Sequence, residues 1–327
     1  MAAIDIMGGG PAGAMAAIAA LGEGAQVRVF EKSAFPRHKV CGEFLSPEVL
    51  PLLQRAGCAD DFLRLRPAVI RRMELHFGSR VVRHRLPRTA HGLSRYALDH
   101  LLLEKAASLG AEVVREIGTP RLARRPLVVT TGRTTRGATG DRLFGFKAHF
   151  RGLADDAVAL FFFEGGYVGI SAVEDGVTNV CGLAPERVLR ECAFRPERLV
   201  ARCEAAAARL EKMEQLFEWL NTGPLVLGLA RRVTPKALVY PAGDALGFID
   251  PFTGSGLLSA MLTGRSAGRA AVRGQSVRAF IAARRFALVR PFVVSTLCRA
   301  ALAVGVAGPL ASLVPGRWLF RVTRPAV

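Results

Sequence analysis

The first thirty residues show a hydrophobic pattern that changes twice within a short distance. Residues 3–7 form a brief apolar run, residues 11–21 are rich in alanine, and residues 26–31 alternate between apolar and polar positions. A short apolar run is typical of a buried strand, an alanine-rich segment favours a helix, and alternation favours a strand. The chain is therefore predicted to open with a strand, a helix and a second strand.

Three glycines stand at the turn between the first strand and the helix. Gly8, Gly10 and Gly13 fill the pattern G-x-G-x-x-G. In such a turn the first glycine permits the tight bend, the second lets the backbone approach a pyrophosphate, and the third lets helix and strand pack closely. The helix N-terminus adds free N–H groups and a partial positive charge. Glu31 ends the second strand 18 positions after Gly13, where a dinucleotide fold places the acid that binds ribose hydroxyls, so we predict a dinucleotide site.

The apolar pattern farther along the chain predicts further strands and helices. A helix is expected to follow Ser94 as its N-cap and to stop at Gly110, since serine caps helices and glycine ends them. The other helices are predicted near residues 48–56, 198–220 and 257–271. The strands are predicted at residues 71–77, 81–84, 111–114, 128–133, 144–150, 157–163, 165–171 and 178–183, and from residue 237 onward.

A second glycine-rich motif follows the last predicted strand. Gly243 and Asp244 come directly after it, and the loop Gly254-Ser255-Gly256 precedes the last predicted helix. This arrangement brings a carboxylate, backbone N–H groups and the positive end of a helix to one place. Such a helix end stabilises the negative charge of a reduced flavin. Two motifs some 230 residues apart that fit one ligand predict FAD.

The amino-acid composition limits the kinds of binding partner and metal site that are expected. The 45 basic and 27 acidic residues give a formal charge of +18, but no zinc-finger spacing or RNA-binding signature accompanies it, so nucleic acid is not predicted as a partner. The six cysteines are scattered without C-x-x-C, and neither a metal site nor a disulfide framework is predicted. The first strand begins at residue 3, which leaves no room for a signal peptide and predicts a cytoplasmic location.

The C-terminal segment, residues 286–327, is basic and apolar. The chain contains no acidic residue after Asp250, whereas residues 251–327 hold eleven arginines. The apolar stretch 300–316 is interrupted by glycine and proline and is too short to span a membrane. Two interpretations stay open: an interfacial segment on the anionic inner face of a membrane, or a helical cap over a substrate channel.

The loop Arg37-His38-Lys39-Val40-Cys41-Gly42, together with the first glycine motif and Glu31, resembles the geranylgeranyl reductase family. That family belongs to the FAD enzymes shaped like p-hydroxybenzoate hydroxylase. The resemblance implies that the loop lies along the flavin ring, that Arg95 lies by the FAD and that Asp244 binds a ribityl hydroxyl. Cys41 and Tyr167 are the predicted catalytic residues. The predicted cofactor-binding residues are Gly8, Gly10, Pro11, Ala12, Gly13, Glu31, Lys32, Arg37, Cys41, Gly42, Arg95, Gly243, Asp244, Pro251, Gly254, Ser255 and Gly256.

The sequence departs from the family pattern at two places. Only a dozen or so residues separate Arg115 from Val128, where the family has a long β-meander, and Thr131 stands where the family usually has aspartate. After Tyr167, residues Val168, Gly169 and Ser171 replace the tryptophan and proline common in the reductases. These departures leave the reaction type open.

The resemblance implies an FAD-dependent oxidoreductase that acts on a lipophilic substrate. The first hypothesis is hydride transfer from reduced flavin to a C=C bond of an isoprenoid-type lipid. The alternatives are a monooxygenase of an aromatic, polyketide or quinone-type substrate, and a degenerate flavoprotein without turnover. The electron donor is expected to be NAD(P)H or a reduced carrier protein.

These elements predict an α/β fold, in which a Rossmann-like FAD-binding domain is interleaved with an antiparallel-sheet substrate domain. Residues 1–70, 90–140 and 232–285 are assigned to the first domain, residues 71–89 and 141–231 to the second, and residues 286–327 to a C-terminal helical tail.

Overall fold

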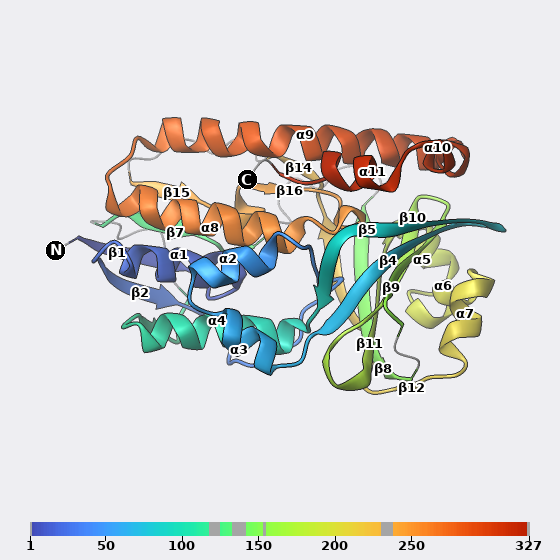
Figure 1. The fold of residues 1–327 in the computed structure, drawn as a ribbon, viewed down its shortest axis with the longest axis horizontal. Coiled ribbons are helices and arrows are strands. Elements are labelled where there is room, and N and C mark those ends of the chain that lie inside the picture. The colour runs from blue at the N-terminus through green and yellow to red at the C-terminus, as the bar shows by residue number, and fades with distance from the viewer. Residues whose placement is uncertain (1, 118–124, 133–141, 153–154, 230–237, 326–327) are drawn as a thin grey trace.

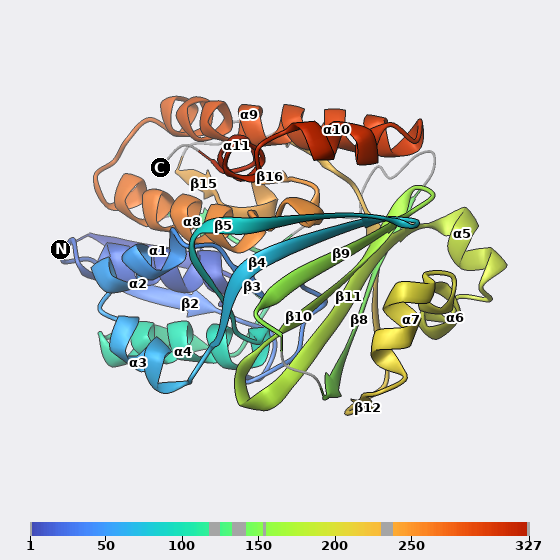
Figure 2. The ribbon, with the colours of Figure 1, turned by 45° about the vertical axis from the view of Figure 1, so that its right-hand side comes forward.

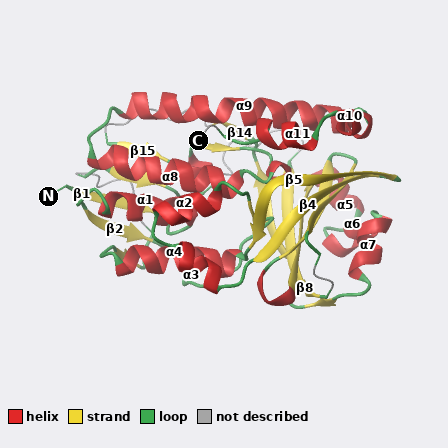
Figure 3. Ribbon diagram, viewed as in Figure 1, coloured by secondary structure: helices red, strands yellow, loops and turns green. Residues whose placement is uncertain are grey.

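The computed structural model describes residues 2–117, 125–132, 142–152, 155–229 and 238–325. Two large sheets lie side by side, and helices cover both of them (Figures 1 and 3). The predicted fold class, a mixed α/β fold with C-terminal helices, is confirmed. The division of the chain into two domains stays a prediction.

The first sheet is parallel, as the opening strand–helix–strand pattern predicts. Its strands lie in the order β15-β7-β1-β2-β6. Ile4, Ile6 and Val29 have no exposed surface, because both faces of such a sheet are covered. The strands are β1 (Ala3–Met7), β2 (Gln26–Phe30), β6 (Glu112–Val114), β7 (Leu127–Val129) and β15 (Val239–Pro241).

The helices on this sheet pack at backbone distance. A Cβ added to Gly264 would lie 2.0 Å from the carbonyl oxygen of Ala12, and one added to Gly268 would lie 2.2 Å from that of Ala16. Helices α1 and α8 therefore touch through glycine, with the first turns of α1 packed against the middle of α8. Ser94 caps α4, accepting from the Ala97 N–H at 3.1 Å, as predicted. The helices are α1 (Pro11–Leu21), α2 (Val49–Arg55), α3 (Ala59–Arg64), α4 (Arg95–Ser108) and α8 (Gly256–Val272).

The second sheet is mixed, which corrects the prediction of a purely antiparallel sheet. Its order is β12-β8-β11-β10-β9-β4-β5-β3, with β13 also paired to β8, and β4 lies parallel to β9. The hairpin around residues 78–79 is longer than predicted. The strands are β3 (Phe44–Leu45), β4 (Ala68–Phe77), β5 (Arg80–Gly92), β8 (Leu143–Arg151), β9 (Ala157–Phe163), β10 (Gly166–Ala172), β11 (Val177–Pro185), β12 (Glu214–Gln215) and β13 (Leu220–Leu225).

The prediction of one helix over residues 198–220 is wrong. Three short helices, α5 (Glu186–Glu191), α6 (Pro196–Ala201) and α7 (Glu204–Leu210), lie on the outer face of the second sheet (Figure 2). Residues 214–215 and 220–225 then become strands, because β8 offers them a free edge to pair with. Tertiary pairing overrides the local helical preference here. A small third sheet pairs β14 (Gly228–Leu229) with β16 (Gly247–Phe248).

The C-terminal helical tail begins earlier than predicted. Helix α9 runs from Val277 to Ala303, 27 residues, and passes through Pro291. Helices α10 (Ala307–Leu313) and α11 (Gly316–Val322) follow it across the same side of the molecule (Figures 1 and 2). By length and by its mean hydropathy of 1.5, α9 could cross a membrane, although those criteria alone are weak evidence.

Candidate functional site

A cavity of about 720 Å³ lies between the parallel sheet, the mixed sheet and the C-terminal helices, all of which contribute residues to its lining. Its walls come from the first glycine motif, residues 37–44, the inner face of β4, β9 and β10, the second glycine motif and residues 297–324. Ligand pockets for drug-sized molecules and cofactors span about 300–1,000 Å³. Both motifs found in the sequence therefore open on one cavity of suitable size.

The first glycine motif brings an open helix end to the cavity. Gly8, Gly10, Pro11 and Ala12 line it. Helix α1 has no side-chain cap at Gly10 and no acidic residue in its first turn, so its first N–H groups and its positive end stay available to an anion. Gly13 does not line the cavity. A Cβ there would lie 1.8 Å from the Gly8 carbonyl oxygen, so Gly13 serves the close packing predicted for it.

Glu31 holds the glycine loop in place. Its carboxylate accepts from the N–H groups of Gly9 and Ser33, each at 2.8 Å, and its side chain is largely buried. Burial alone would raise the pKa of Glu31, but these N–H groups and the nearby Arg37 lower it overall. Glu31 and Lys32 both line the cavity, and the binding of ribose hydroxyls by Glu31 stays a prediction.

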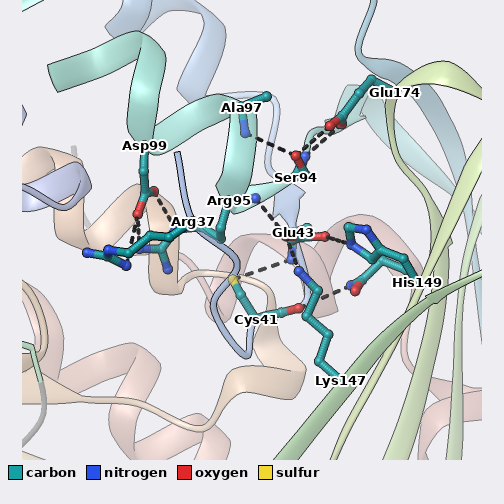
Figure 4. A network of polar contacts seen from close by, with 11 residues as sticks. Arg37, Cys41, Glu43, Ser94, Arg95, Ala97, Asp99, Lys147, His149 and Glu174 are labelled. Carbon is teal, nitrogen blue, oxygen red and sulfur yellow. Dashed lines mark hydrogen bonds and ion pairs between the residues drawn. The ribbon is translucent and has the colours of Figure 1, made fainter. Parts of the chain in front are cut away.

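Arg37 and Arg95 lie near each other beside the cavity, and Asp99 forms an ion pair with each of them (Figure 4). Arg95 contacts Asp99 through two hydrogen bonds of 2.5 and 2.7 Å, and Asp99 has no exposed surface. The anion expected near Arg95 is thus first of all Asp99, four positions along the same helix. Arg37 lies 3.6 Å from Glu31 and 3.9 Å from Asp99. Its Nε and Nη1 are buried without a hydrogen-bond partner among the described residues, so this guanidinium can still donate to a phosphate.

The second glycine motif supplies the opposite wall. Gly243, Asp244, Pro251, Gly254 and Gly256 line the cavity. Helix α8 has no side-chain cap and no acidic residue in its first turn, so a second open helix end faces the site. Ser255 is the predicted residue of this second motif that does not reach the cavity. It is fully buried and hydrogen-bonds to Thr253 at 2.8 Å.

The two predicted catalytic residues lie on different walls. Cys41 and its neighbour Gly42 line the cavity from the loop after β2, and Tyr167 lines it from β10. Tyr167 is 5% exposed, and burial raises the pKa of its hydroxyl well above 10. It therefore stays protonated over the physiological range. The Cys181 thiol also lines the cavity, and burial raises its pKa to about 12.

A buried charge cluster, missed in the sequence, fixes the loop that carries Cys41 (Figure 4). The Glu43 carboxylate has no exposed surface and contacts the Lys147 ammonium, His149 Nε2 at 2.7 Å and the Arg95 N–H at 2.6 Å. Glu43 also adopts a left-handed backbone with φ of 54°, a strained choice for a residue with a side chain. Burial raises the pKa of Glu43, but Lys147 and His149 outweigh it and lower the pKa overall.

Arg324 is a further cavity residue that sequence reasoning missed. It is 6% exposed, donates to the Thr253 carbonyl and stacks over the Phe320 ring at 4.0 Å. Its Nε is buried without a hydrogen-bond partner in the described chain. Burial lowers the pKa of its guanidinium to about 10, so it remains charged at neutral pH. The tail thus places a buried positive charge beside the loop that begins α8.

These residues fit FAD. Two open helix ends, an arginine with unpaired N–H groups, and the acid at the end of β2 meet on one cavity. A Cβ at Gly10 would enter the space in front of the Arg95 guanidinium, at 3.8 Å from Nη2. No group of three His, Cys, Asp or Glu side chains able to hold a metal occurs among the described residues. The site defines a flavoprotein of the FAD-binding type.

Comparisons with known proteins agree with this class. Residues 1–123 match the family model described as "FAD binding domain". Over 56 residues the chain is 43% identical to the menaquinone reductase of Mycolicibacterium smegmatis, a match covering 17% of this chain and 14% of that protein. The chain therefore matches only a small part of that curated relative's length.

Solved structures resemble the whole fold. The flavin-dependent brominase Bmp2 superposes with a TM-score of 0.82 at 18% identity, covering 98% of this chain and 92% of that chain. A flavoprotein/dehydrogenase from Cytophaga hutchinsonii gives 0.81 at 18%, with 98% and 92% covered. A geranylgeranyl bacteriochlorophyll reductase-like protein from Thermoplasma acidophilum gives 0.67 at 16%, with 98% and 90% covered. At these identities the likeness shows the fold alone.

Together these observations make the protein a flavoprotein with an FAD-binding domain. The narrower assignment to the geranylgeranyl reductase family stays a prediction, since reductase and halogenase structures share this fold.

The first glycine motif allows a matched pair of variants. Gly10→Val is expected to fold but to lose FAD, because the new side chain has room within the protein and fills cofactor space. Gly13→Ala is expected to unfold at lower temperature, because its Cβ meets the Gly8 carbonyl at 1.8 Å. Absorbance of the purified proteins near 450 nm and thermal unfolding measure the two effects. A yellow Gly10→Val protein with wild-type FAD content would contradict the placement of the cofactor.

The buried cluster predicts a large and coupled loss of stability. Glu43→Gln leaves the Lys147 ammonium buried and unpaired, so the free energy of unfolding should fall by about 3–5 kcal/mol. Glu43→Gln combined with Lys147→Met should recover part of this loss, because the unpaired charge is then removed. Denaturant titration measures all three proteins, and additive losses in the double variant would argue against the pair.

The same buried cluster predicts that the folded protein loses stability at acid pH. Because the pKa of Glu43 is lower in the folded protein, its stabilisation is complete above the unfolded value of about 4.3 and disappears as pH falls through the folded value. This part of the pH dependence should be missing from Glu43→Gln.

Proposed function

We propose that this protein uses bound FAD to reduce a C=C bond of an isoprenoid-type lipid. The proposal rests on one observation about the cavity. The two open helix ends lie at this cavity, and the rest of its wall is made mainly of apolar side chains. Bound there, FAD supplies hydride transfer between a reductant and the substrate. The following residues would position the substrate, hold its proton and exclude water.

The wall opposite the glycine motifs suits a lipophilic substrate. Strands β4 and β9 contribute Met73, Leu75, Phe77, Leu160 and Phe162 to it. The tail closes the same space with Leu302, Ala307, Leu310, Ala311 and Val314. Apolar surface of this kind favours binding of a hydrocarbon chain through burial, at about 25 cal/mol per Å². A charged or sugar-like substrate would leave its polar groups unpaired here.

Tyr167 is the group best suited to hold the proton that a C=C reduction needs. It lines the cavity and is kept protonated by its buried position. A proton delivered by a side chain in the cavity must come from a group that is protonated at the working pH and within reach of the substrate. Water is excluded from this wall by Phe162 and Phe252, whose rings lie 6.2 and 6.3 Å from that of Tyr167.

The comparisons support a reductase in two ways. One curated relative is named as a menaquinone reductase, and one structural neighbour is described as geranylgeranyl bacteriochlorophyll reductase-like. Menaquinone carries a polyprenyl chain, which belongs to the substrate class proposed from the apolar walls. A monooxygenase of a quinone-type or aromatic substrate is the second candidate. The residues after Tyr167, Val168 and Gly169, favour it, since they lack the tryptophan common in the reductases.

The positive charge of Arg324 is expected to raise the reduction potential of the bound flavin. A positive charge beside the start of α8 favours the reduced, negatively charged form of a bound flavin. A hydrogen bond to a charged group contributes about 1.5–3 kcal/mol, and about 1.4 kcal/mol corresponds to 30 mV for a two-electron couple. Arg324→Gln is therefore expected to lower the reduction potential by about 30–60 mV.

A spectroscopic titration against a reference dye measures that potential. Arg321→Gln, a change of an exposed arginine on the neighbouring turn, serves as the matched control and should leave the potential unchanged. An unchanged or higher potential in Arg324→Gln would exclude the proposed charge effect.

Anaerobic turnover tests the function itself. Enzyme reduced with dithionite and freed of excess reductant should be reoxidised without O2 by a polyprenyl alcohol, which has no quinone ring to reduce, and the product should gain two hydrogen atoms at a C=C bond by mass spectrometry. Tyr167→Phe should slow this step by about 10²–10⁴-fold while keeping its FAD. Tyr96→Phe changes a half-exposed tyrosine outside the cavity lining and should react as wild type.

The outcome also separates the candidates. Reoxidation that needs O2 and adds oxygen to the product would favour the monooxygenase. Enzyme that keeps FAD but is reoxidised by neither route would favour a flavoprotein without turnover.

A further inference from the structure

Helix α9 exposes an apolar stripe that nothing in the described chain covers. Phe286, Val289, Val293 and Leu297 are 82%, 43%, 47% and 64% exposed. Their spacing of three or four residues places them on one face of the helix. The opposite face carries Phe280, Ile281, Leu288 and Pro291 into the core. The helix therefore presents apolar side chains both inward and outward.

Helices α10 and α11 lie on the same side of the molecule as α9 (Figures 1 and 2), and this part of the chain exposes further apolar side chains. Val304, Leu310, Leu313 and Trp318 are 72%, 49%, 80% and 62% exposed. Half of the exposed large apolar side chains in the described chain fall between residues 286 and 318. We call this set, on α9, α10 and α11, the apolar tail face. An exposed apolar area that is concentrated in this way marks an interaction surface.

The charge around the apolar tail face has one sign. The chain has no acidic residue after Asp250, and it has eleven arginines there. Arg278, Arg290, Arg317 and Arg321 are exposed, while Arg299 is used inside the fold, where it contacts Asp250 at 2.6 Å. Apolar side chains with arginines around them match the interface of an anionic lipid bilayer.

The cavity reaches the surface at this face. Leu297 and Leu310 are 64% and 49% exposed, and both also line the cavity. Ala301, Ala307 and Val314, from the same helices, line it as well. A hydrocarbon chain could thus move from a bilayer to the cavity without crossing water.

The contacts of α9 indicate that it lies on the bilayer and does not cross it. Its inner residues pack against β14, β15 and α8, and Arg299 holds both Asp250 and the Gly165 carbonyl. A spanning position would remove these contacts and bury the arginines of the helix in hydrocarbon, which is strongly unfavourable.

We propose that the apolar tail face docks on an anionic membrane surface and that the substrate enters the cavity from the bilayer there. The substrate route rests on the proposed function, whereas docking does not. Vesicles without substrate therefore test docking even if the reductase activity fails.

Flotation of the FAD-loaded protein measures docking. Vesicles of phosphatidylcholine with about 30% phosphatidylglycerol should carry the protein upward at low salt, and pure phosphatidylcholine should not. Salt at 0.5 M should release it, because the Debye length falls to a few Å. The variant Phe286→Ser/Leu313→Ser/Trp318→Ser should bind at least tenfold more weakly, through lost insertion. Arg278→Glu/Arg317→Glu should weaken binding at least tenfold, through lost attraction.

Leu63→Ser/Leu109→Ser is the matched control, because it removes exposed apolar side chains of α3 and the end of α4. It should float as wild type, and FAD absorbance and the melting temperature verify the fold of every variant. Wild-type protein that stays at the bottom with anionic vesicles would overturn the proposal, as would a triple serine variant that floats like wild type. A dimer in sedimentation that the triple variant converts to monomer, without flotation, would assign the face to a second copy instead.

Discussion

The buried carboxylate of Glu43 is the constraint on which the rest of the site depends. It lies in the loop after β2, yet its partners come from β8 and from the first turn of α4. A single ionised group thereby joins the loop, the mixed sheet and a helix of the parallel-sheet half. Because a buried charge without a partner costs several kcal/mol, only one arrangement of these three elements satisfies it. That arrangement also fixes Cys41 and Gly42, the two residues directly before Glu43, at the cavity wall.

Several independent groups supply positive potential to the cavity. Helices α1 and α8 meet through glycines at backbone distance, so their N-termini open on one cavity. Arg37 and Arg324 add two guanidinium groups whose N–H groups are incompletely used within the described chain. Asp99 and Glu31 balance part of this charge. The surplus suits a ligand with a pyrophosphate at one end and a ring that becomes negative on reduction at the other.

The sequence predicted the features whose signals are local. The glycine motif, Glu31, the Ser94 cap and the loop before α8 each depend on a few neighbouring residues, and the structure has them where the spacing implies. The Arg95–Asp99 pair also had a local signal, the separation of four positions on one helix face. Glu43 and Lys147 lie 104 positions apart, and no periodicity connects them. Residues 214–215 and 220–225 became strands for the same reason, since the edge of β8 is a tertiary feature.

The C-terminal tail has an inner and an outer face, and both carry apolar side chains. Its inner side chains complete a core and the cavity, and its Arg324 reaches the loop before α8 through the Thr253 carbonyl. Its outer side chains gain nothing from the described protein, although Phe286 and Leu313 are among the most exposed apolar residues in it. In a protein that meets only water, polar residues at these positions would keep the fold and improve solubility. Folding alone does not require these apolar side chains on the outside. A lipid bilayer beside the opening of the cavity explains them better.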